Sequence, residues 1–127
     1  SLFCPLLDLP NTQFYSLQVG FGSEQLENLP DKSKIINLAL SISDFSDTAA
    51  AIENLDLLIT IDSSVAHLAG ALGKKTWIIL PTNLEWRWFL DEDKTVWYES
   101  ARLFRPKLGQ DKSEVISRIY RNLTEIL

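Results

Sequence analysis

The residues of this chain that could do chemistry gather in the stretch from Asp62 to His67. It combines one carboxylate and two hydroxyls with the chain's single imidazole. If a helix begins here, its first backbone N–H groups have no partner within the helix, and serine hydroxyls beside them can help to hold a phosphate or sulfate ion. His67 follows Ser63 by one helical turn, so both side chains share a face and the imidazole leans back toward the N-terminus. The stretch is a candidate anion site.

Two patterns place this stretch between a strand and a helix. The run from Leu57 to Ile61 is almost wholly apolar, which is typical of a strand covered on both faces in a parallel sheet. From Val65 the apolar residues recur at helical spacing, and Gly73 ends the helix. In open α/β sheets, ligands bind beyond the carboxyl ends of the strands, where this turn would lie.

An ordinary helix cap explains the same residues without a ligand. Serine and aspartate are common caps, and a single histidine is often only a hydrogen-bonded structural residue. Both interpretations stay open on spacing alone.

The remaining elements repeat the order strand, helix, strand. Composition and periodicity predict strands over 13–19, 35–38, 76–80 and 103–104, and helices over 23–29, from Ser46 or Asp47 to about Leu55, and from Asp111 to the end. Glu114 is placed for a capping-box contact in the last helix. This order predicts an α/β fold with a Rossmann-like, mainly parallel sheet and helices on both faces.

Two loops are further candidates for ligand contact. Gly20-Phe21-Gly22 is either a ligand-facing loop or a plain turn between a strand and a helix. Pro81 to Tyr98 is rich in aromatic residues, which either cover an end of the sheet or contact a ligand. There, Trp86 or Trp88 could stack on a base or sugar, and Arg87 could pair with a phosphate.

A local basic group is a minor candidate. It consists of Arg102, Arg105 and Lys107, and such a group is more often a solvated face than a site.

Composition limits the function classes. A chain of 127 residues with 46% hydrophobic and 23% charged residues is one globular domain or part of one. A net charge of −5 and a pI near 4.8 argue against a nucleic-acid partner or an acidic membrane surface.

The numbers of cysteines and histidines and the hydropathy pattern exclude further kinds of site and protein. Cys4 is the only cysteine, which excludes an internal disulfide and a cysteine-based zinc cluster, and one histidine argues against a transition-metal site. No stretch approaches the roughly 20 apolar residues of a membrane span. We expect a soluble, cytoplasmic protein.

Several motifs together carry a family resemblance. Asp62 to Gly73 resembles the donor-site segment of glycosyltransferase family 9, the heptosyltransferase-like enzymes with the GT-B fold. Flanking segments resemble, in the same order, the C-terminal region of bacterial proteins that join tetratricopeptide repeats to a glycosyltransferase-like domain. These segments are 15–20, 44–50, 86–88 and 97–105.

The resemblance implies that residues 1–127 form a single, partial C-terminal domain, an incomplete half of a GT-B fold. The family's Asp-Thr-Gly-x-x-His pattern falls on Asp62, Ser63, Ser64 and His67, and Val65 belongs to the same turn. The implied ligand is a nucleotide-diphosphate sugar, its diphosphate at the helix start, bound without metal or other cofactor. Further donor or acceptor contacts are expected at Gln18, Gly20, Pro81, Trp86 and Arg87.

The resemblance also implies a missing partner. In these enzymes the catalytic base is expected from an N-terminal domain, so no catalytic residue is assigned here, and the chain alone should transfer no hexosyl or heptosyl group. A truncated sheet would expose edges and could self-associate into a homo-oligomer. The alternatives are a non-catalytic interaction or assembly module with a vestigial site and, third, a plain phosphate-binding α/β domain.

Overall fold

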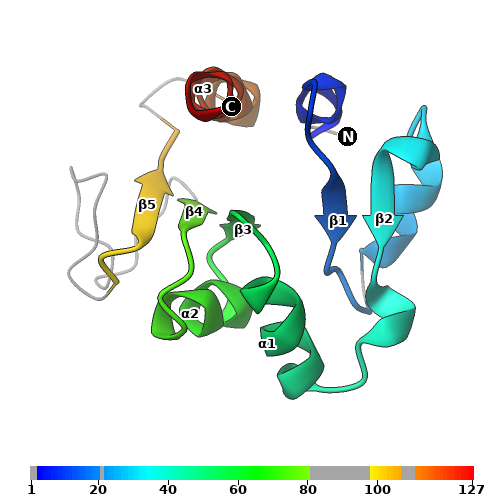
Figure 1. Ribbon diagram of the computed structural model, residues 1–127. Coiled ribbons are helices and arrows are strands. Elements are labelled where there is room, and N and C mark those ends of the chain that lie inside the picture. The colour runs from blue at the N-terminus through cyan, green and yellow to red at the C-terminus, as the bar shows by residue number, and fades with distance from the viewer. Residues whose placement is uncertain (1–2, 21, 81–97, 107–110) are drawn as a thin grey trace. The chain divides into compact units, whose positions relative to one another are not determined.

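The computed structural model describes residues 3–20, 22–80, 98–106 and 111–127 (Figure 1). The chain divides into two compact units. Unit 1 comprises Ser1–Asp47 and Lys112–Leu127, and unit 2 comprises Thr48–Asp111. The candidate anion site belongs entirely to unit 2.

The described elements alternate between strands and helices, as the sequence predicts. Short 3-10 helices are labelled η. In chain order the elements are η1 (Cys4–Asp8), β1 (Phe14–Ser16), η2 (Ser23–Asn28), η3 (Lys32–Lys34), β2 (Ile35–Asn37), η4 (Ala39–Ser41), α1 (Phe45–Glu53), β3 (Leu58–Ile61), α2 (Ser64–Ala71), β4 (Thr76–Ile79), β5 (Ala101–Phe104) and α3 (Lys112–Ile126).

The strands in the described ranges pair in parallel and form two sheets. Unit 1 holds the two-stranded sheet β1-β2, and unit 2 holds the three-stranded sheet β3-β4-β5. The α/β class with parallel strands is therefore confirmed. The placement of helices on both faces, and the description of the chain as one partial domain, stay predictions.

The core of unit 2 lies around β4, whose residues are all buried. Leu80 follows β4 and is also buried, which agrees with the continuous apolar pattern of a strand covered on both faces. Helix α2 packs on β3 and β4, as Figure 1 shows. It places two fully buried alanines, Ala66 and Ala69, on its inner face, and such small residues let the helix approach the sheet closely.

Strand β3 is less buried than its sequence predicts. Leu58 is 6% exposed, but Ile61 at the other end of the strand is 60% exposed. Strand β3 is an edge strand of the three-stranded sheet, and Ile61 is its last residue. Its carboxyl end therefore opens toward solvent, where the candidate site begins.

The end of α2 is fixed by a Schellman motif. The N–H of Gly73 donates to the carbonyl of Gly70 and that of Lys74 to the carbonyl of Ala69, each at 3.0 Å. Gly73 has a φ of 71°, a conformation that residues with a Cβ avoid. The sequence prediction that Gly73 ends the helix is confirmed.

Helix α1 begins at Phe45, earlier than predicted. The carboxylate of Asp44 accepts the N–H of Asp47 at 3.0 Å, and that of Asp47 accepts the N–H of Ser43 at 2.8 Å. The prediction that Ser46 or Asp47 caps this helix is therefore wrong. Asp44 supplies the cap, and Asp47, one turn later, reaches back toward the incoming chain.

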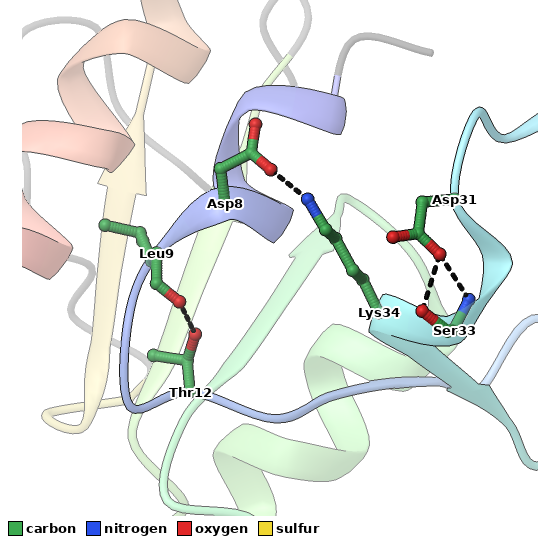
Figure 2. A network of polar contacts seen from close by, with 6 residues as sticks. All are labelled: Asp8, Leu9, Thr12, Asp31, Ser33 and Lys34. Carbon is green, nitrogen blue, oxygen red and sulfur yellow. Dashed lines mark hydrogen bonds and ion pairs between the residues drawn. The ribbon is translucent and has the colours of Figure 1, made fainter.

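Local polar contacts hold the short elements of unit 1, as Figure 2 shows. The carboxylate of Asp8 in η1 pairs with the ammonium of Lys34 in η3, and this contact raises the pKa of Lys34. At the start of η3, Asp31 accepts the N–H of Ser33 at 3.0 Å and its hydroxyl at 2.5 Å. These two hydrogen bonds lower the pKa of Asp31.

Helix α3 packs against η1 in unit 1. Its buried residues are Val115, Ile116, Ile119 and Leu123, while Tyr120 is 38% and Ile126 50% exposed. Glu114, expected to form a capping-box contact, has its carboxylate 3.0 Å from Nε of Arg118. Among the described helices, none combines the length and apolar character that crossing a bilayer requires.

Replacement of Gly73 tests the account of the α2 terminus. Gly73→Ala should lower the free energy of unfolding by about 1 kcal/mol, because alanine is strained at a positive φ. Gly73→Asn should cost less, since asparagine tolerates this conformation better. Urea unfolding followed by circular dichroism measures both. Equal stability of wild type and Gly73→Ala would contradict the observed turn.

Candidate anion site at the start of α2

The structure places Asp62 and Ser63 between the end of β3 and the start of α2. Ser63 is the N-cap residue, with extended backbone angles of −160° and 171°, and its carbonyl accepts the N–H of His67 at 3.3 Å. The predicted order of strand, turn and helix is confirmed here. Of the predicted site residues, Asp62, Ser63, Ser64, Val65 and His67 all lie on this turn.

The Ser63 hydroxyl does not cap the helix, contrary to the sequence prediction. It makes no side-chain cap hydrogen bond and lies 3.5 Å from the Thr60 hydroxyl. The physical reason is the competing hydroxyl of β3, which offers this side chain another partner.

The backbone amides of the turn are consequently available to an outside acceptor. In any α-helix the first N–H groups, here those from Ser63 to Ala66, have no carbonyl acceptor one turn earlier. Ser64 is exposed, and Asp62, Ser63 and Val65 are partly exposed. Apart from the fully buried Ala66, these residues therefore place the positive end of a helix dipole on a surface that solvent reaches.

The imidazole of His67 lies between a carboxylate and a phenol. Its Nε2 is 3.7 Å from Oδ1 of Asp62, and its Nδ1 is 3.1 Å from the hydroxyl oxygen of Tyr98. The side chain of His67 is 27% exposed and that of Asp62 is 15% exposed. The Nε2 edge of the ring thus faces Asp62, and the Nδ1 edge faces Tyr98.

Tyr98 is a site residue that the sequence analysis does not single out. Its ring packs against Gly70 of α2, where an added Cβ would lie 2.4 Å from the ring. The signal that could have found this contact is Gly70 itself. Glycine within a helix costs up to about 1 kcal/mol relative to alanine, so its presence suggests a close approach by another group.

Arg105 lies at the same edge of the sheet as the turn. The strand register aligns Ile61, Ile79 and Phe104, so Asp62 and Arg105 each follow directly beyond the aligned strand ends. At the usual spacing between strands, their backbones are about 10 Å apart. Of the basic group considered from sequence, Arg105 is thus the member at the candidate site's edge, while Lys107 lies outside the described residues.

Arg102 packs against two aromatic rings. Its guanidinium carbon lies 4.9 Å from the ring centroid of Phe104 and 6.0 Å from that of Trp77. The two rings are themselves packed with centroids 5.2 Å apart. Arg102 covers this aromatic pair, a cation–π arrangement that accounts for it without a ligand.

The other predicted contacts belong to other parts of the chain. Gln18 and Gly20 belong to unit 1, after β1, and Gly20 has the positive φ of 79° expected of the loop. Pro81, Trp86 and Arg87 lie outside the described residues. Within the ranges that the structure covers, no group of three or more His, Cys, Asp or Glu side chains could hold a metal ion.

Comparison with protein-family models, with curated proteins and with solved structures finds no match to this chain. The functional argument therefore depends on the geometry of the turn.

Two substitutions compare how much the N-cap side chains of α1 and α2 contribute to stability. Ser63→Ala should change the free energy of unfolding by less than about 0.5 kcal/mol, because the Ser63 hydroxyl does not cap α2. Asp44→Ala should lower it by about 1 kcal/mol, because Asp44 does cap α1. Urea unfolding of both variants checks this contrast. A loss for Ser63→Ala as large as that for Asp44→Ala would show that Ser63 is a working cap.

Proposed function

We propose that the turn from Asp62 to Val65 binds the diphosphate of a nucleotide-sugar donor. On this proposal the chain is the donor-binding C-terminal portion of a GT-B glycosyltransferase of family 9. The observation that carries it is the orientation of Ser63, whose hydroxyl faces Thr60 and leaves the amides of an accessible helix start for an outside acceptor. Those amides favour a negatively charged group.

The side chains of the turn suit a diphosphate in different ways. The exposed Ser64 can donate its hydroxyl as well as its N–H. The carboxylate of Asp62 repels an anion, but His67 lies beside it and, when protonated, offsets its charge. Such fixed donors would also stabilise the negative charge that develops on the diphosphate as it leaves the sugar.

The position of Arg105 supports the same proposal. A guanidinium can hold phosphate oxygens through two parallel hydrogen bonds. The carboxyl end of β4 lies between the backbones of Asp62 and Arg105, which are about 10 Å apart, so a donor that reached both residues would cross over that strand end. In this arrangement the amides of α2 would bind one part of the donor and the carboxyl edge of β5 would lie beside another.

Exposed apolar residues of unit 1 favour a second candidate, an interaction or assembly module. Tyr15 and Ile36 are register partners in the β1-β2 sheet and each is 42% exposed, while Leu40 is fully exposed. Under this candidate, nucleoside diphosphates would leave the melting temperature unchanged. Leu40→Glu would instead lower the molecular mass measured by light scattering.

A proline at the first position of α2 tests the proposed function. Ser64→Pro removes one amide donor, yet proline is well tolerated at this position and after an extended residue such as Ser63. The matched control Ser64→Ala keeps the N–H and loses only the hydroxyl. UDP, GDP and ADP are added to each protein, and the melting temperature and the Kd are measured.

We expect at least one nucleoside diphosphate to raise the melting temperature of the wild type. Ser64→Pro should weaken its binding by about 10- to 100-fold, the usual loss for a hydrogen bond to a charged group, and Ser64→Ala should weaken it less. Binding that is equally strong in Ser64→Pro and wild type would contradict the proposal. So would the absence of any shift with all three nucleotides.

A further inference from the structure

We infer that Tyr98 is the positioning residue for His67 and selects its tautomer. The hydroxyl of Tyr98 donates a hydrogen bond to Nδ1 of His67, so the neutral imidazole carries its proton on Nε2. The consequence for ligand binding rests on the proposed function, but the tautomer itself does not.

The partners of the two ring nitrogens determine the assignment. A neutral imidazole has one N–H donor and one acceptor nitrogen, whereas a carboxylate only accepts. Nε2 faces Oδ1 of Asp62 at 3.7 Å, and two acceptors turned toward each other would repel. The proton therefore belongs on Nε2, which leaves Nδ1 to accept from the Tyr98 hydroxyl at 3.1 Å.

Packing fixes the position of the Tyr98 hydroxyl. The ring lies against Gly70 and against the buried core cluster of Ala66, Ile78, Leu80, Ala101 and Leu103. The carbonyl of Tyr98 accepts the N–H of Ala101 at 3.2 Å, which ties its backbone to the start of β5. The rings of Tyr98 and His67 meet edge to face, with centroids 5.8 Å apart and an angle of 63°.

This arrangement gives Gly70 a defined role. Gly70 and His67 lie almost one turn apart on α2, so a phenol that passes over the glycine reaches the imidazole. A methyl group at position 70 would meet Tyr98 at 2.4 Å and would force the ring to move. The small side chain at 70 thus allows the hydroxyl at 98 to hold the histidine.

The inference adds a donor to the proposed diphosphate site. With its proton on Nε2, His67 presents an N–H on the side of Asp62, the residue that precedes the N-cap of α2. The opposite tautomer would present a lone pair there, which would repel phosphate oxygens. Tyr98 does not touch the ligand in this account and acts only through His67.

Because the chain has a single histidine, nuclear magnetic resonance can read its tautomer without ambiguity. The 15N shifts of the imidazole are measured on the whole chain at about pH 8.5, two units above the ordinary imidazole value. Three variants are compared with the wild type: Tyr98→Phe removes the hydroxyl, Gly70→Ala displaces the ring, and Tyr15→Phe is a control at an exposed tyrosine.

The wild type and Tyr15→Phe should show a protonated Nε2 and an unprotonated Nδ1. Tyr98→Phe and Gly70→Ala should both show a mixture of the two tautomers. If UDP binds the wild type, Tyr98→Phe should weaken it by about 3- to 10-fold, as expected for one neutral hydrogen bond.

Two results would overturn the inference. One is a wild-type His67 protonated on Nδ1, and the other is an unchanged tautomer in both Tyr98→Phe and Gly70→Ala. Either result leaves the proposed function standing if Ser64→Pro still weakens nucleotide binding. Conversely, if no nucleotide binds but the tautomer shifts as expected, the proposed function fails and the positioning role of Tyr98 is supported.

Discussion

The amide hydrogens at the first turn of α2 are the constraint on which the account of this protein depends. A helix cannot satisfy its own first N–H groups, so a side chain, water or a ligand must do so. At α1 the chain uses a side chain, because Asp44 accepts the N–H of Asp47. At α2 the serine in the same position turns its hydroxyl to Thr60 instead. This difference between two helix starts of one chain makes the second one a candidate site.

The rest of unit 2 holds that turn in place. Buried alanines bring α2 close to β3 and β4, and the Schellman motif at Gly73 fixes the far end of the helix. Lys74 extends the same bend, because its ammonium donates to the carbonyls of Glu53 and Leu55 at 3.0 and 2.7 Å. A basic side chain at the end of α1 also complements the negative end of that helix dipole. The turn is therefore accessible but supported from both sides.

Local patterns predict the framework of the site. The apolar run before Asp62, the helical spacing after Val65 and the stop at Gly73 are all readable because each depends on neighbouring residues. Parallel pairing follows from the alternation of strands and helices. The exposure of Ile61 does not, because it depends on the tertiary packing around the end of β3.

Sequence patterns could not predict the contacts between residues that are far apart in the chain. Tyr98 and His67 are 31 positions apart, and only folding brings the phenol over Gly70 and onto the imidazole. The orientation of the Ser63 side chain could not be predicted for a related reason. The Thr60 hydroxyl and the amides of α2 compete for its hydroxyl, and residue spacing cannot decide between them.

The most direct test of the anion site is a backbone 15N–1H titration of the chain with inorganic pyrophosphate. The account predicts that the largest shift changes fall on the amides of Ser64 and Val65, and unchanged amides at this turn would contradict it.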